Sequence, residues 1–190
     1  VCEFHSPDQA VVRQHIETCK RFCELVKDIG GKGVKVRPNG LPANVPVEKT
    51  LEQIGRSLAE CGRAASDNGV EIWVEVHGNG SSHPPHCKTM MEVANHRSVG
   101  LTWNSNQTDI KDGSVAEYFR MLRPWIKSCH SNDLGNDASG KYPYRELVKL
   151  LRSIGYDRYT LCEVGTAYDP VKGAAFFKEY KATWEKLVRG

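Results

Sequence analysis

Strand-like and helix-like segments alternate along almost the whole chain, and this alternation limits the fold more than any other feature. Short runs rich in β-branched residues predict strands at 33–38, 70–77, 99–104, 126–130 and 159–164. Apolar residues at helical spacing predict a first helix that ends at Gly30, and further helices over about 47–67, 86–96, 114–123, 143–153 and 171–188. Repeated βα units are typical of an α/β fold with a parallel sheet. No linker interrupts them, so residues 1–190 are expected to form a single domain.

The first helix carries signals at both ends. Ser6 or Asp8 can cap its amino terminus, Pro7 fits its first turn, and Gly30 ends it. The apolar positions that keep a helical spacing between these ends are Val11, Val12, Ile16, Cys19, Phe22, Cys23 and Val26.

Charge and apolar content describe an ordinary globular chain. Of the 190 residues, 39% are hydrophobic and 26% are charged, which is enough to bury a core. The net charge of +3 is spread along the chain without a block of Lys and Arg, so no nucleic-acid partner is expected. No window approaches the roughly 20 apolar residues of a membrane span, and the first residues do not resemble a signal peptide. We therefore expect no membrane association.

The seven cysteines fall within predicted helices and strands rather than in a closely spaced loop framework. This placement favours a reducing compartment, and we expect a cytoplasmic protein. Cys19 and Cys23 are one helical turn apart, which would suit a metal pair, but no second Cys or His pair has a matching spacing. Packing in the core is the simpler role for both residues.

Polar residues gather where the predicted strands end. The set consists of Arg37, Glu75, His77, Asn104, His130 and Glu163, with Asp133 three residues after His130. In parallel α/β folds, ligands bind at the carboxyl ends of the strands, where the βα loops converge. Glu75 and His77 share one face of their strand, which we expect to point into a barrel mouth. Trp73 lies deeper on the same face and is expected to belong to the core.

Single residues of this set also have plain structural explanations. Glu75 can be a carboxylate that pairs with Lys35 or Arg37, and His77 can be an ordinary loop histidine. As a set, however, two glutamates, a histidine and an asparagine at four strand ends match the ligands of a divalent ion such as Mn, Mg, Co or Zn. The expected ligands are Glu75, Asn104, His130 and Glu163.

Four motifs, WVEVHG, VGLTWN, KSCHSND and TLCEVG, occur in this order along the chain. They resemble the last four strands of the xylose isomerase-like TIM barrels, a superfamily of sugar and sugar-phosphate isomerases and epimerases. The resemblance extends from GKGVKVRPNG to the final helix. It implies a (β/α)8 TIM barrel of which this chain supplies about the last five βα units.

The resemblance also implies roles for individual residues. Glu75 and Glu163 would each be a metal ligand and a catalytic acid/base, and His130 would be another metal ligand. His77 would contact the substrate. Asp133 would follow His130 in a His-x-x-Asp turn at the substrate site.

The chain departs from the family pattern at three positions. Where relatives commonly carry an Asp ligand and, three residues later, a His, this chain has Asn104 and Gln107. Where many relatives have Lys before the Asp of the His-x-x-Asp turn, it has Asn132. An Asn carbonyl oxygen can bind a hard cation, but it is neutral. We therefore expect the divalent metal to bind more weakly.

The expected activity is metal-dependent isomerisation or epimerisation of a sugar or sugar phosphate through a cis-enediolate. One glutamate would remove a proton from carbon and the other would return it, while Arg37 or His77 holds a hydroxyl or phosphate group. One alternative is a metal-depleted barrel that binds a sugar or serves as an interaction module, which Asn104 and Gln107 favour. Another is an endonuclease-IV-like phosphodiesterase, which would need two or three metals and a basic DNA-facing surface.

Five strands are too few to close a small barrel. The opening stretch VCEFHSPD is expected to be the tail of a strand that enters a helix. We therefore expect about three more βα units upstream in the natural protein, or pairing with another chain, for example with a second copy in a homo-oligomer. Either arrangement would cover the edges that five strands leave unpaired.

Overall fold

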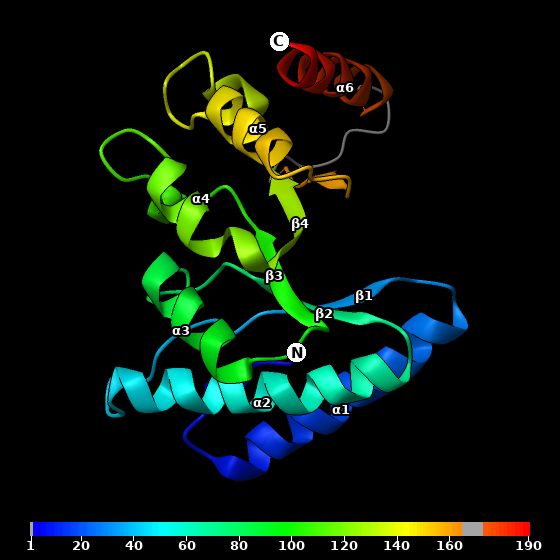
Figure 1. The fold of residues 1–190 in the computed structure, drawn as a ribbon, viewed down its shortest axis with the longest axis vertical. Helices are drawn as coiled ribbons and strands as arrows, with labels where there is room; N and C mark the ends of the chain where they lie inside the picture. Colours follow the sequence, from blue (N-terminus) through cyan, green and yellow to red (C-terminus); the bar gives the residue numbers. More distant parts are fainter. Residues whose placement is uncertain (1, 165–172) are drawn as a thin grey trace.

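Five parallel strands form one curled sheet in the computed structural model, which describes residues 2–164 and 173–190 (Figure 1). The strands are β1 (Gly33–Val36), β2 (Glu71–Glu75), β3 (Val99–Trp103), β4 (Ile126–Ser131) and β5 (Thr160–Cys162). They pair in chain order, β1-β2-β3-β4-β5, as consecutive βα units predict. The sheet is a half-barrel, which confirms the partial TIM-barrel architecture.

Helices separate the strands in the predicted order. They are α1 (Gln9–Asp28), α2 (Val47–Asp67), α3 (Pro84–Ala94), α4 (Ala116–Leu122), α5 (Tyr144–Ser153) and α6 (Gly173–Arg189). Helices α1, α2 and α3 contact β1, β2 and β3, respectively, and α6 packs against α5. Residues 171 and 172, predicted to start the last helix, lie outside the described residues.

Alternating side chains divide the strands between two environments. Val34 of β1 and Ile72 and Val74 of β2 are buried in the apolar core, together with the inner faces of the helices. Lys35 and Trp73, which are in register with each other, lie on the opposite, concave face. The core therefore lies between the sheet and the helices, on the face opposite to Lys35 and Trp73.

Two helix starts differ from the prediction. Asp8 caps α1, because its Oδ1 accepts a hydrogen bond from the backbone N–H of Ala10 over 2.8 Å. Pro7 therefore precedes the cap instead of lying in the first turn. Helix α3 begins at Pro84, two residues before the predicted start, since proline needs no backbone N–H in a first turn. Its C-cap is Asn95, which has a left-handed φ of 39°.

Trp73 is not a core residue, and that prediction is wrong. Its indole N–H donates to Glu71 over 2.7 Å, and the guanidinium of Arg158 lies 5.7 Å from the ring centroid. Burial raises the pKa of Glu71, but hydrogen bonds from Arg158, Lys127 and Trp73 outweigh it and lower the pKa to about 2. The concave face therefore carries a charged cluster at the amino ends of the strands, far from their carboxyl ends.

Cys19 and Cys23 are fully buried, as predicted for core residues. Hydrogen bonds with the thiols of Cys2, Cys23 and Cys61, together with burial, raise the pKa of Cys19. The thiols in this cluster join α1, α2 and the segment before α1. All four side chains are buried, as is usual for cysteines that pack in a core.

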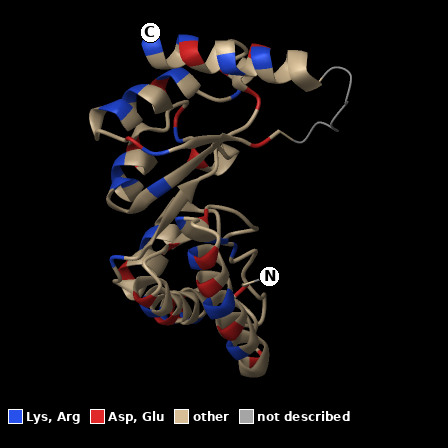
Figure 2. Ribbon diagram, turned by 90° about the vertical axis from the view of Figure 1, so that its right-hand side faces the viewer, with Lys and Arg blue, Asp and Glu red and all other residues tan. Residues whose placement is uncertain are grey.

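The outer surface of the helices carries both signs of charge. Figure 2 shows basic and acidic residues interspersed along the helices, for example on α6. Arg56 pairs with Glu52 and Lys88 with Glu92, one helical turn apart. Within the described part of the chain, no helix has the length and apolar character needed to cross a membrane.

Candidate functional site

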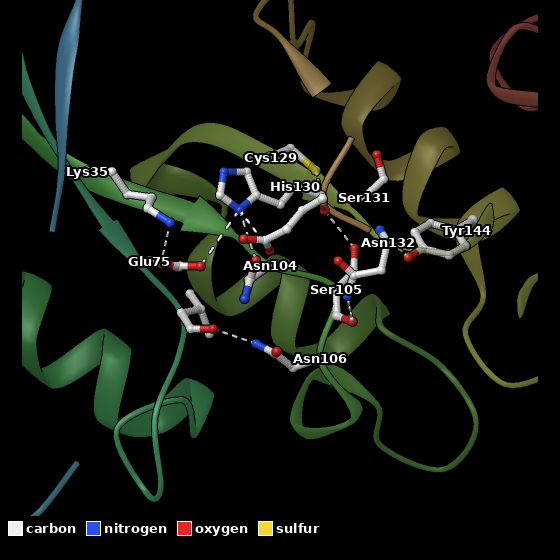
Figure 3. Close-up of polar contacts among 12 residues, drawn as sticks. Lys35, Glu75, Asn104, Ser105, Asn106, Cys129, His130, Ser131, Asn132 and Tyr144 are labelled. Atoms are coloured by element: carbon white, nitrogen blue, oxygen red, sulfur yellow. Dashed lines mark hydrogen bonds and ion pairs between the residues drawn. The ribbon is translucent and has the colours of Figure 1, made fainter. Parts of the chain in front are cut away.

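Polar side chains from four neighbouring strands converge at the carboxyl end of the sheet. Glu75 ends β2, Asn104 follows β3, His130 lies in β4 and Glu163 follows β5. Nδ1 of His130 lies 3.8 Å from Oε1 of Glu75, 3.0 Å from Oδ1 of Asn104 and 3.2 Å from Oε2 of Glu163. Figure 3 shows Glu75, Asn104 and His130 turned toward one another. The parallel register produces this arrangement, because it brings the strand ends to one edge.

The Nδ1 atom of His130 is surrounded by oxygen atoms. An imidazole nitrogen either carries a proton or offers a lone pair. Facing three oxygens, Nδ1 therefore donates a proton to one of them or shares a cation with them. Glu75, His130 and Glu163 offer ligand atoms that all lie within 4.8 Å of one another, and the amide oxygen of Asn104 supplies a fourth. Three oxygens and one imidazole nitrogen suit a divalent ion, so these residues fit a metal.

Glu75 is the most deeply buried member of the cluster. Its side chain is 1% exposed, whereas that of Glu163 is 44% exposed. Nζ of Lys35 lies 2.8 Å from Oε2 of Glu75, so the cation that pairs with this carboxylate is Lys35. The contact lacks hydrogen-bond geometry, and Oε2 has no hydrogen-bond donor in the described part of the chain. One oxygen of Glu75 thus faces a protein cation and the other faces the cluster.

The loop after β3 connects the ends of both neighbouring strands. The hydroxyl of Ser105, a residue with a left-handed φ of 54°, donates to the backbone carbonyl of His130 over 2.8 Å. Nδ2 of Asn106 donates to the backbone carbonyl of Val76 over 2.5 Å. Asn132, just after β4, donates to the backbone carbonyl of Ser105 over 3.4 Å. These bonds, drawn in Figure 3, fix the spacing of the ends of β2, β3 and β4.

A buried carboxylate anchors this loop. Asp109 is 1% exposed, and its Oδ2 accepts hydrogen bonds from the backbone N–H of Asn106 over 2.7 Å and from the hydroxyl of Tyr142 over 3.1 Å. The Tyr142 hydroxyl accepts from the indole N–H of Trp103 over 2.8 Å. Oδ1 of Asp109 has no partner among the described residues. Burial raises the pKa of Asp109 to about 7, although the bonds from Asn106 and Tyr142 lower it.

Reasoning from the sequence did not single out Ser105, Asn106, Asp109 or Tyr142. The bond between Asp109 and Tyr142 joins residues 33 positions apart, and such contacts leave no local pattern. Asn106 and Asp109 do carry a local signal, because they are three residues apart and form a capping box. That spacing alone would have marked the start of a turn.

The residues predicted to contact substrate follow the ends of β1, β2 and β4. Arg37 is exposed just past β1 and has no ion-pair partner among residues 2–164 and 173–190. Nδ1 of His77 lies 3.2 Å from Oδ1 of Asn39. Asp133 is exposed and caps the short 3₁₀ turn that follows it. Gln107 is exposed and bonds away from the cluster, to the backbone before α5. Substrate contact by Arg37, His77 and Asp133 remains a prediction.

Several solved structures share this fold. The 3-keto-D-glucoside 4-epimerase YcjR from E. coli is 15% identical, with a TM-score of 0.75, and the match covers 99% of this chain and 75% of that one. The IOLI protein with a bound zinc atom is 19% identical, with coverages of 98% and 73% and a TM-score of 0.75. A xylose isomerase-like TIM barrel protein from Mycobacterium smegmatis in complex with magnesium is 18% identical, with coverages of 96% and 69% and a TM-score of 0.64. At these identities the likeness shows the fold.

No curated protein sequence matches the chain. The family model described as the xylose isomerase-like TIM barrel matches residues 2–180, which is nearly the whole chain. The half-barrel of five parallel strands agrees with this match. The chain therefore belongs to the xylose isomerase-like TIM barrel family.

Proposed function

We propose that this protein is a metal-dependent isomerase or epimerase of a sugar or sugar phosphate. The observation that carries the proposal is the pair of carboxylates, Glu75 and Glu163, that flank Nδ1 of His130 from two different strands. Two carboxylates and an imidazole at the carboxyl end of a barrel sheet suit a divalent ion and proton transfer at carbon. Similar structures that include a sugar epimerase and proteins with zinc or magnesium support this chemistry.

The two glutamates divide the proton transfers between them. One carboxylate takes the proton from the carbon beside the carbonyl of an open-chain sugar, which gives a cis-enediolate. Return of a proton to the opposite face of the same carbon gives the epimer, and return to the neighbouring carbon gives the isomer. Glu163 is accessible from the mouth, while Lys35 holds the buried Glu75 in place. A divalent ion in the cluster would supply Lewis-acid stabilisation of negative charge on the sugar oxygens.

Residues around the cluster would bind the rest of the substrate. Arg37 lies two residues past Lys35 on the concave face of the β1 strand end, and its guanidinium suits a phosphate or a hydroxyl group. His77 and Asp133 follow the ends of β2 and β4 and suit sugar hydroxyls. These contacts would set the orientation of the sugar above the cluster.

The second candidate is a barrel that binds a sugar without catalysis. Asn104 brings no charge to the cluster, and Lys35 neutralises one of its two carboxylates. The four converging side chains and Lys35 together therefore keep one net negative charge. A lower negative charge weakens the attraction for a divalent ion.

Proton exchange with solvent distinguishes the two candidates. The full-length protein would be incubated with Mn²⁺ in deuterated water and a panel of ketoses and ketose phosphates, and deuterium at the carbon beside the carbonyl would be measured. Exchange that disappears in Glu163→Gln but persists in Glu179→Gln, an exposed glutamate on α6, supports catalysis. Sugar binding by calorimetry without exchange of any panel member would favour the binding barrel.

A further inference from the structure

Three residues of the segment after β3 connect the strand ends that carry the site. We call Ser105, Asn106 and Asp109 the loop brace. Ser105 bonds to the β4 backbone at His130, and Asn106 bonds to the β2 backbone at Val76 (Figure 3). Both neighbours of β3 are therefore held by one loop. These bonds lie beside the converging side chains and leave their ligand atoms free.

Asp109 closes a ring of hydrogen bonds around Asn104. The path leaves the chain at the indole of Trp103, passes through the Tyr142 hydroxyl and the Asp109 carboxylate, and returns at the backbone N–H of Asn106. Trp103 directly precedes Asn104, and Asn106 comes two residues after it. The backbone on either side of Asn104 is therefore tied to Asp109, directly at Asn106 and through the Tyr142 hydroxyl at Trp103, and this sets the direction in which the Asn104 amide points.

A carboxylate buried without a cation, such as Asp109, destabilises the folded protein, so a purely structural role does not explain it. Asp109 has an unpartnered Oδ1, and within the described ranges no Lys, Arg or His pairs with it. The titratable groups that face it are the Tyr142 hydroxyl and the buried thiols of Cys87 and Cys129, none of which supplies a positive charge. Burial of a carboxylate without a cation costs free energy. Buried charged groups without a partner of opposite charge are concentrated at functional sites.

We propose that Asp109 is a positioning residue of the site, which sets the direction of the Asn104 amide and the spacing of the β2 and β4 ends through the loop brace. The proposal rests on the proposed function, because Asp109 would orient the Asn104 amide for the binding of a divalent ion. Asp109 touches neither the ligand atoms nor the substrate. Without its acceptor oxygen, the N–H of Asn106 loses its partner, and Asn104 is no longer held 3.0 Å from Nδ1 of His130.

Calorimetric titration of the full-length protein with Mn²⁺ alone tests this role. Asp109→Ala removes the acceptor and is expected to lower the affinity about tenfold, the lower end of the range found when direct hydrogen-bond partners of metal ligands are removed. Asp109→Asn keeps an acceptor oxygen and is expected to stay within about threefold of the wild type. Asp112→Asn, which removes a charge from an exposed position in the same loop, should leave the affinity unchanged.

Tyr142→Phe provides a second route if Asp109→Ala does not fold. It removes one of the two donors to Asp109 and is expected to weaken Mn²⁺ binding less than Asp109→Ala does. Faster hydrogen exchange at the Asn106 amide should accompany the loss of affinity. If the wild type binds Mn²⁺ and the folded variants bind it equally well, the positioning role is wrong and the proposed function stands. If the wild type binds no Mn²⁺, both proposals fall.

Discussion

Nδ1 of His130 lies 3.0 Å from Oδ1 of Asn104, within hydrogen-bond distance and also close enough for the two atoms to bind one ion. Asn104 thus stands among the candidate metal ligands although it brings no charge. The cluster offers ligand atoms for a metal, but the neutral amide of Asn104 attracts a cation less than a carboxylate would. Replacing Asn104 with a charged residue is therefore the first test of the site.

Asn104→Asp is expected to raise the affinity for Mn²⁺ or Mg²⁺ by about tenfold or more, because a full charge replaces an amide dipole next to the ion. Isothermal titration calorimetry on the full-length protein measures the change. Asn44→Asp, which adds the same charge at an exposed loop position, is the matched control. No metal binding by either the wild type or Asn104→Asp would mean that the cluster is not a metal site, and Glu75 and Glu163 would be better explained as polar contacts to a sugar.

Metal should stabilise the folded protein by linkage, by about 2.7 kcal/mol when free Mn²⁺ is a hundred times its dissociation constant. Glu163→Gln and His130→Ala should abolish this increment, since each removes a ligand. The Glu163 side chain is 44% exposed, so Glu163→Gln should change the metal-free stability by less than about 0.5 kcal/mol. Urea unfolding with and without Mn²⁺ gives both numbers. An increment that survives in Glu163→Gln would place the ion elsewhere.

The first strands could be predicted because β1 and β2 each bury one apolar face. Val34, Ile72 and Val74 alternate with polar residues, and this period of two identifies strands without knowledge of the partners. The first residues of α1 and α3 were harder to predict, since the prolines there, Pro7 and Pro84, fit both before a cap and inside a first turn. The expectation of about three upstream βα units remains a prediction.

The converging residues could be predicted because each follows a strand, and parallel strands bring their carboxyl ends together. The choice between Lys35 and Arg37 as the partner of Glu75 could not be made, because it depends on where two long side chains reach. Trp73 was misplaced for a similar reason. On its face of β2, Trp73 lies between Glu71 and Glu75, and Arg158 from the segment before β5 lies over its ring.

Glu71 should stabilise the fold above its unfolded pKa. Its pKa falls from 4.5 to about 2 in the folded protein, so the stabilisation is present above about pH 4.5 and is lost as the pH falls toward 2. Because the cluster is partly exposed, Glu71→Gln is expected to cost about 1–2 kcal/mol at pH 7. Urea unfolding at several pH values should show the two proteins converging below pH 3. A difference independent of pH would indicate lost packing instead of lost charge.

Asp109 should have the opposite pH dependence. Its pKa rises from 3.8 to about 7 on folding, so its stabilising contribution is complete below about pH 3.8 and is lost as the pH rises through 7. Asp109→Asn is therefore expected to be more stable than the wild type at pH 8, by about 1–3 kcal/mol, because no buried charge forms. At pH 4 the two proteins should differ little. An equal gain at both pH values would show that the charge of Asp109 is not the cause.

Lys35 should oppose metal binding while it stabilises the metal-free protein. Its ammonium lies 2.8 Å from Oε2 of Glu75, where it repels an incoming cation but also compensates a carboxylate that is only 1% exposed. Lys35→Met is expected to raise Mn²⁺ affinity about tenfold. Because the Lys35 side chain is 42% exposed, the loss of metal-free stability should be limited to about 1–2 kcal/mol.

Calorimetry and urea unfolding with and without Mn²⁺ measure both effects of Lys35→Met, and Lys32→Met removes the same charge from an exposed position as a control. Saturation with Mn²⁺ should restore the stability lost in Lys35→Met, because the ion takes over the compensation of Glu75. Weaker Mn²⁺ binding in Lys35→Met would contradict the prediction that Lys35 and the ion compete for Glu75. It would mean that Lys35 holds Glu75 in the position from which it binds the ion.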